Sequence, residues 1–155
     1  MKTLILYATK YGATHEIAKK IGSRIDGSVI CDIKAGNLPP ISDYECIIIG
    51  SSLYAGSIRK EAKEFLTKNE AGFNGKIVGL FLSGMSEGEA DEAFKNNFPT
   101  SILENAKSKA LLGGIFDPQK AGAFARFIMK VVTKQSGYQN NINDEKINTF
   151  IQNLK

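Results

Sequence analysis

Continuous apolar runs recur along the chain and predict strands that are buried on both faces. Runs of this kind are typical of parallel sheets covered by helices on both sides. A shorter and more polar run predicts an edge strand at Ser28–Ile33. The predicted buried strands are Leu4–Tyr7, Ile47–Ile49, Ile77–Leu82 and Leu111–Phe116.

Helical periodicity fills the intervals between these runs. Ile17, Ile21 and Ile25 repeat every four residues and predict an amphipathic helix. Three further sets of apolar residues have helical spacing and predict helical regions. They are Ala62, Phe65 and Leu66; Ala90, Ala93, Phe94, Ile102, Leu103 and Ala106; and Ile147, Phe150, Ile151 and Leu154. Pro99 interrupts the region between Phe94 and Ile102. Strands that alternate with helices predict an α/β sandwich of one domain, residues 1–155, with right-handed crossovers.

The composition is that of a single domain with a substantial core. Of the 155 residues, 43% are hydrophobic and 23% are charged, which argues against disorder. No apolar run approaches the ~20 residues of a membrane span. The N-terminal segment also lacks the pattern of a signal peptide, so we expect a cytoplasmic protein. Cys31 and Cys46 show no CxxC pattern, which indicates neither a disulfide scaffold nor a zinc site, and both are expected to be small apolar groups within strands.

The net charge of +4 is concentrated in one segment. Residues 118–143 contain Lys120, Arg126, Lys130 and Lys134 and no acidic residue. This is not the wide basic stripe of a nucleic-acid binder, so we expect no nucleic-acid partner. The four-residue spacing of the last three favours a helix with one basic face. That face is either simply solvated or a docking surface for an anionic membrane or an acidic redox partner.

Ligands of such sheets bind beyond the carboxyl ends of the strands, which directs attention to three loops. The first loop, residues 9–14, runs directly into a helix. Its hydroxyls, its glycine and the free backbone N–H groups of the helix predict a cradle for a phosphate. An ordinary strand-to-helix turn is the alternative interpretation.

The second loop (residues 51–56) and the third loop (residues 83–88) are rich in small residues. Small residues let the backbone approach a planar ligand, and Tyr54 offers a ring for stacking. A structural turn explains either loop by itself, but three such loops at one edge favour a ligand site. The candidate cofactor-binding residues are Thr9, Lys10, Tyr11, Gly12, Ala13, Thr14, Ser51, Ser52, Leu53, Tyr54, Ala55, Gly56, Ser83, Gly84, Met85, Ser86, Glu87 and Gly88.

These loops resemble those of the flavodoxins. Thr9-x-Tyr11-Gly12-x-Thr14 is similar to the flavodoxin phosphate loop, and Gly50-Ser51-Ser52-Leu53-Tyr54-Ala55-Gly56 to the flavin-stacking loop. The resemblance covers essentially the whole chain. It implies a flavodoxin-like three-layer sandwich with a five-stranded parallel sheet of order 2-1-3-4-5. It also implies FMN as cofactor, with the ribityl phosphate at the first loop and the isoalloxazine ring between the second and third.

A narrower resemblance lies in residues 124–137. Arg126-Phe127, Lys130, Lys134 and Ser136-Gly137 are similar to a segment of the menaquinone-dependent protoporphyrinogen dehydrogenases. This resemblance implies an FMN-dependent oxidoreductase that passes electrons from a porphyrinogen to FMN and on to menaquinone, with a quinone as partner. The basic face adds the hypothesis that the protein is peripheral to the inner face of a quinone-containing membrane. The second loop departs from those enzymes, which tend to carry an arginine and then a tyrosine before the glycine.

Two other functions stay open on the sequence. One is a flavodoxin that carries single electrons between protein partners without a small-molecule substrate, and the other is a binding module that has lost flavin. A phosphoacceptor receiver domain is excluded, because its acidic pair, its aspartate and its lysine are missing after the corresponding strands. His15 is expected to be a solvated surface residue. No side chain is assigned as a catalytic acid or base, and no metal site is expected.

Overall fold

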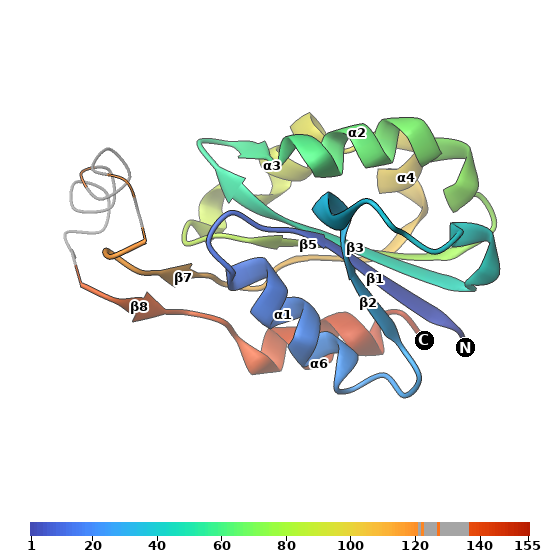
Figure 1. Cartoon of the computed structure of the whole chain (residues 1–155), viewed down its shortest axis with the longest axis horizontal. Coiled ribbons are helices and arrows are strands. Elements are labelled where there is room, and N and C mark those ends of the chain that lie inside the picture. The colour runs from blue at the N-terminus through green and yellow to red at the C-terminus, as the bar shows by residue number, and fades with distance from the viewer. Residues whose placement is uncertain (121, 123–126, 128–136) are drawn as a thin grey trace.

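The computed structural model shows a parallel sheet between two layers of helices (Figure 1). It describes residues 1–120, 122, 127 and 137–155. The sheet order is β2-β1-β3-β5-β6, which is the predicted order 2-1-3-4-5 when only the parallel strands are counted. The predicted fold is therefore confirmed. The parallel strands are β1 (Thr3–Ala8), β2 (Val29–Asp32), β3 (Cys46–Tyr54), β5 (Ile77–Ser83) and β6 (Ala106–Leu111).

Helices cover both faces of the sheet (Figure 1). One face carries α1 (Ala13–Gly22) and α6 (Asp144–Gln152), whose apolar residues share a core with Ile5 and Tyr7. The other face carries α2 (Lys60–Asn69), α3 (Ala90–Asn97) and α4 (Thr100–Asn105). Short 3-10 turns join the elements at η1 (Ile33–Ala35), η2 (Ile41–Asp43), η3 (Glu70–Phe73) and η4 (Glu87–Glu89).

Successive side chains of a strand point to opposite faces, and this alternation builds the two cores. On β1, Leu4 and Leu6 face α2 while Ile5 faces α1, and each of the three is fully buried. A strand that is buried on both faces is apolar at nearly every position, which explains the continuous runs of the sequence.

The fifth predicted strand was placed too late in the sequence. The structure has β6 at Ala106–Leu111, so Ala106 begins a strand rather than ending a helix. β6 is an edge strand in which exposed Lys107 and Lys109 flank buried Ser108, a pattern that does not resemble a buried strand. The apolar run that follows leaves the sheet at Gly113, whose φ of 91° lies in the left-handed region.

Two short strands were not predicted, β4 (Ser57–Ile58), which returns antiparallel to β3, and β8 (Gln139–Asn140). The end of the predicted strand Leu111–Phe116 is a strand of its own, β7 (Ile115–Phe116), which pairs antiparallel with β8 as a separate ribbon. Figure 1 shows this ribbon extending away from the main sheet. The ribbon starts where Gly113 crosses the chain beside Asn141, so closely that a Cβ on Gly113 would lie 1.9 Å from the carbonyl oxygen of Asn141.

Other sequence predictions need smaller changes. α1 ends at Gly22, and Ile25 lies beyond it because i→i+3 hydrogen bonds such as Ile25 N–H to the Gly22 carbonyl tighten the chain into turns. Cys46 is buried as predicted, whereas Cys31 is half-buried because β2 lies at the sheet edge.

The predicted basic face, Arg126, Lys130 and Lys134, lies outside the described residues, as does most of the segment 124–137 that carries the narrower resemblance. Within the part of the chain that the structure describes, no helix is long and apolar enough to cross a membrane.

Candidate functional site

The first loop ends in an open helix N-terminus. Gly12 precedes α1 with a φ of 101°, a left-handed conformation that glycine adopts without strain. The Thr9 hydroxyl oxygen accepts a 2.9 Å hydrogen bond from the Gly12 N–H, which tightens the turn. The first helical bond runs from Glu16 N–H to the Gly12 carbonyl, so the N–H groups of the three residues between them have no acceptor among the described residues. This is the geometry predicted for an anion cradle.

Thr14 joins the first loop to the third. Its hydroxyl oxygen lies 2.8 Å from that of Ser83, and both side chains are buried. Thr14 is on the first turn of α1 and Ser83 is the last residue of β5. The hydrogen bond therefore holds the helix N-terminus against the carboxyl edge of the sheet.

Ser52 supplies a buried hydroxyl that lacks a partner among the described residues. Ser52 pairs in register with Ser83, and directly paired residues of neighbouring strands point to the same face of a sheet. The unpartnered hydroxyl therefore lies on the α1 side, next to the Thr14–Ser83 pair. A buried hydroxyl without a partner is unfavourable unless a ligand or a water molecule satisfies it.

The second loop is the tip of a tight hairpin between β3 and β4. Leu53 pairs with Ile58 and Tyr54 with Ser57, which leaves a two-residue turn at Ala55 and Gly56. Both turn residues have positive φ, 49° and 77°, as in a type I′ turn. Ala55 is the non-glycine residue with positive φ among the described residues. The hairpin projects the 42% exposed Tyr54 ring at the carboxyl edge of the sheet.

Lys10 links the first loop to the second. Its Nζ lies 4.7 Å from the centre of the Tyr54 ring and 5.2 Å from that of Tyr11. Both distances are within the range of cation–π attraction. Gly84 of the third loop lies against the side of the second, because a Cβ built on it would be 3.6 Å from the Leu53 Cβ. The structure thus brings residues of all three predicted loops together.

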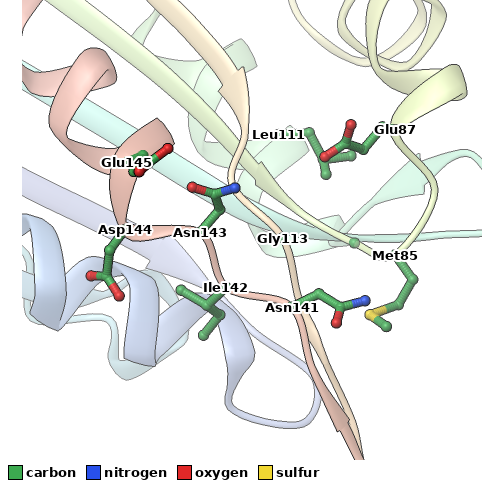
Figure 2. Close-up of a pocket in the computed structure, with 10 residues that line it drawn as sticks. Met85, Glu87, Leu111, Gly113, Asn141, Ile142, Asn143, Asp144 and Glu145 are labelled. Atoms are coloured by element: carbon green, nitrogen blue, oxygen red, sulfur yellow. The ribbon is translucent and has the colours of Figure 1, made fainter.

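The third loop opens into a hollow that the sequence did not reveal. This cavity of about 640 Å³ lies between the third loop and the chain that enters α6. Figure 2 shows Met85 and Asn141 facing each other across one part of it. No residue of the first or second loop lines it. The hollow is lined by Gly84, Met85, Glu87, Leu111, Gly113, Asn141, Ile142, Asn143, Asp144 and Glu145.

Most of the acidic charge around this hollow is paired. Glu87 forms an ion pair with Lys146, and Asp144 bridges to Lys20 and Arg24 of the α1 region. These partners hold the pKa of Asp144 below its usual range, with the Arg24 hydrogen bond as the largest cause. Figure 2 shows the Asp144 side chain directed away from the hollow toward α1.

Tyr7 and His15 stack beside the cradle. Their ring centres are 4.9 Å apart with planes inclined by 17°. His15 is half-buried rather than solvated, because Tyr7 points from β1 toward the same side as α1. Burial raises the pKa of Tyr7, and nearby Asp32 and Cys31 add to the rise. Tyr7 is therefore a neutral phenol at neutral pH.

The remaining third-loop candidates differ in their surroundings. Ser86 and Gly88 are exposed around η4, while Glu87 turns toward α6. Two residues near the second loop were missed: Asn97 at the end of α3, which contacts the hairpin, and Arg59, whose N–H donates to the Ser51 hydroxyl at 2.9 Å. Neither contact has a local sequence pattern that could have shown it.

Comparison with known proteins gives a consistent picture. A family model described as a flavodoxin domain matches residues 4–143. The chain is 24% identical to protoporphyrinogen IX dehydrogenase (quinone) of Escherichia coli, with 96% of this chain and 88% of that protein covered. It is also 24% identical to a flavodoxin of a Nostoc species, with 97% and 94% covered. Among solved structures, a Fusobacterium nucleatum flavodoxin bound to flavin mononucleotide aligns with a TM-score of 0.58 and 16% identity, over 97% of this chain and 95% of that one.

Proposed function

Because the chain belongs to the flavodoxin-domain family, we propose that it is an FMN-dependent oxidoreductase of the protoporphyrinogen dehydrogenase type. FMN is the cofactor. When bound, FMN supplies the redox chemistry by accepting electrons from a reduced substrate and passing them to a quinone. The protein's part is to bind the flavin, to set the surroundings of its ring and to control access.

The residues of the cradle fit FMN. A phosphate monoester needs several hydrogen-bond donors, and the open N–H groups of Ala13, Thr14 and His15 provide them together with the favourable end of the helix dipole. The Thr9 hydroxyl keeps its proton free for donation, because its oxygen is the acceptor in the bond to Gly12. The unpartnered Ser52 hydroxyl offers a further polar contact below the loops.

The second and third loops would hold the ring. Tyr54 and Tyr11 are partly exposed aromatic rings on the same edge of the sheet, and both lie near Lys10. An aromatic ring stacks on a planar heterocycle at a gain of about 0.5–1.5 kcal/mol beyond its buried area. The small residues of the third loop leave the backbone accessible for hydrogen bonds to a planar ligand.

The hollow beside Met85 is the single observation that carries the enzymatic proposal. A carrier that exchanges electrons with protein partners needs no pocket, whereas a cavity of about 640 Å³ can admit a small organic substrate next to the third loop. Its lining combines apolar side chains such as Met85 and Leu111 with polar ones such as Asn141, which suits an amphipathic molecule. Two of its three carboxylates are paired with cations, so the lining remains compatible with a substrate that bears carboxylates.

An anaerobic turnover assay tests this proposal. The flavin-loaded protein is mixed with protoporphyrinogen, with and without menaquinone, and oxidation of the porphyrinogen is followed by absorbance. We expect quinone-dependent turnover, and we expect Met85→Trp, which fills the hollow, to reduce it by at least tenfold. Glu89→Ala, an exposed change just beyond the same loop, is the control. A protein that binds FMN but gives no turnover in this assay would contradict the enzymatic proposal.

The second candidate is a one-electron carrier, which the exposure of Tyr11 and Tyr54 favours. These rings are 39% and 42% exposed, so the edge of a bound flavin would be open to a protein partner. Fast electron exchange with a redox protein, together with no porphyrinogen oxidation, would select this candidate.

We also propose that Arg126, Lys130 and Lys134 bring the protein to an anionic membrane, where quinones reside. Their support is the charge pattern of the sequence, since each basic residue near an anionic surface contributes about 1 kcal/mol. Binding to phosphatidylglycerol vesicles is expected to fall by more than tenfold when all three are replaced by glutamate. Lys60→Glu, Lys63→Glu and Lys68→Glu together make the control, because these exposed α2 lysines undergo the same charge change. Unchanged vesicle binding by the first variant would overturn the membrane proposal.

A further inference from the structure

Three helices on one face of the sheet end in asparagine in the same way. Asn69, Asn97 and Asn105 are the last residues of α2, α3 and α4. Each donates from its side-chain amide to the carbonyl four residues earlier, at 2.9, 2.8 and 2.8 Å. This contact closes the last turn of a helix and by itself indicates only a structural role.

Asn97 makes two further contacts that the other two asparagines lack. Its Nδ2 donates a 2.8 Å hydrogen bond to the Gly56 carbonyl, and its Oδ1 accepts a 3.2 Å bond from the Ile58 N–H. Both partners belong to the β3–β4 hairpin that forms the second loop. The amide of Asn97 thus uses both of its N–H groups and its oxygen, which makes it a fully satisfied polar side chain.

These two contacts occupy the free edge of β4. Ser57 pairs with Tyr54 across the hairpin, so the polar backbone groups of its two neighbours point away from β3. One of them, Ile58, is 5% exposed, and its N–H would lose its acceptor if Asn97 were absent. The Asn97 side chain therefore takes the place of a neighbouring strand.

We propose that Asn97 is a positioning residue that holds the second loop, and through it the Tyr54 ring, in place for the flavin. This inference rests on the proposed FMN-binding function and names a residue outside the three loops. Tyr54 directly precedes the turn and pairs with Ser57 across the hairpin. Asn97 forms hydrogen bonds to the residues on either side of Ser57. The turn itself is strained, because Ala55 has a φ of 49°. The two hydrogen bonds from Asn97, which we call the Asn97 clamp, lie on the side of β4 that faces away from β3 and keep such a turn from relaxing into another conformation.

The test compares Asn97→Ala with Asn105→Ala. Both variants lose the same helix-ending hydrogen bond, but only the first loses contact with the hairpin. In FMN titrations of the flavin-free protein we expect Asn97→Ala to weaken binding about tenfold, as the loss of two hydrogen bonds implies, and Asn105→Ala to stay within twofold of the parent. Bound flavin should also fluoresce more strongly in Asn97→Ala, because a displaced Tyr54 ring quenches it less.

A double-mutant cycle with Tyr54→Ala shows whether Asn97 acts through that ring. We expect the FMN affinity of Asn97→Ala/Tyr54→Ala to be close to that of Tyr54→Ala alone. Additive losses, or equal affinities for Asn97→Ala and Asn105→Ala, would overturn the inference. Failure of the parent protein to bind FMN would instead defeat the proposed function. In that case, amide hydrogen exchange at Ile58 still tests whether Asn97 holds the hairpin. Exchange must accelerate in Asn97→Ala and not in Asn105→Ala.

Discussion

The hydroxyl oxygens of Thr14 and Ser83 lie 2.8 Å apart in a buried environment and join two loops that are distant in the sequence. Thr14 contributes a backbone N–H to the proposed phosphate cradle, and Ser83 ends the strand that leads into the third loop. The contact therefore makes the two loops parts of one unit.

Replacement of Thr14 by valine tests this connection. Valine keeps the shape of the side chain but removes the hydroxyl, so the buried Ser83 hydroxyl loses its partner. We expect the free energy of unfolding of the flavin-free protein to fall by about 1–3 kcal/mol in urea titrations. Thr67→Val is the control, because the Thr67 hydroxyl bonds to the Lys63 carbonyl on an exposed face of α2, and its loss should cost about 0.5 kcal/mol or less. Equal effects of the two changes would mean that the Thr14–Ser83 contact contributes nothing specific.

Ala55→Gly is expected to stabilise the protein. An alanine at a φ of 49° carries a steric cost of about 1–2 kcal/mol that glycine does not have, although glycine loses more backbone entropy on folding. We expect a net gain of about 1 kcal/mol in the free energy of unfolding. Ala71→Gly, an exposed change at a position with negative φ, should be destabilising instead. A loss of stability in Ala55→Gly would show that the turn has a different conformation.

Gly50 begins the segment that resembles the flavin-stacking loop, yet its lack of a side chain serves the core. A Cβ at this position would lie 2.0 Å from Cζ of the buried Phe81 ring. We expect Gly50→Ala to lower the free energy of unfolding by about 1–3 kcal/mol or more. Phe81→Leu makes room for the new methyl group, so the double variant should lose less than the sum of the two single changes. Strict additivity in urea titrations would contradict this close packing.

The sheet could be predicted from the sequence because each of its central strands contains a continuous apolar run. β1, β3 and β5 are buried on both faces over most of their length, and short continuous apolar runs are typical of such strands. β6 was misplaced because its exposed lysines at positions 107 and 109 make an edge strand look like a polar connection. The β4 strand was missed because two residues carry no periodicity at all.

The three loops of the site could also be predicted, since strand order alone brings the carboxyl ends of β1, β3 and β5 together. The contacts that support these loops could not be predicted from the sequence. Asn69, Asn97 and Asn105 look alike in the sequence, and only the tertiary structure shows that one of them reaches the hairpin. The hollow beside Met85 likewise depends on the return of the chain at Asn141, which local patterns do not reveal.

Lys10→Met is expected to lower the reduction potential of bound FMN. Lys10 holds its cation over the Tyr54 ring, at the loop that would flank the flavin. Reduced flavin carries more negative charge, so removal of a nearby cation makes reduction less favourable, by roughly 1 kcal/mol for a partly screened charge. A shift of a few tens of millivolts should appear in redox titrations and shrink at high salt. Lys68→Met, in the last turn of α2, should leave the reduction potential unchanged. An equal shift in both variants would show that Lys10 does not act on the flavin from a nearby position.

The buried thiol of Cys46 predicts a loss of stability at alkaline pH. Burial raises the pKa of Cys46 from 9.0 to about 11, because the thiolate is poorly solvated in the core between the sheet and α6. In the unfolded chain the thiol ionises near pH 9, whereas in the folded protein it stays protonated up to about pH 11. The unfolded state therefore releases its proton first, so the free energy of unfolding falls between about pH 9 and pH 11 by up to roughly 2–3 kcal/mol.

Cys46→Val removes this titration and keeps an apolar group of similar size in the core. Its free energy of unfolding should depend less on pH between pH 8.5 and 11 than that of the parent, with the two curves diverging as the pH rises. Cys31→Val is the matched control, because Cys31 is half-buried on the edge strand and has a smaller rise in pKa, also caused by burial. If all three proteins lose stability in parallel over this range, other groups dominate the alkaline transition and the Cys46 thiol is not its cause.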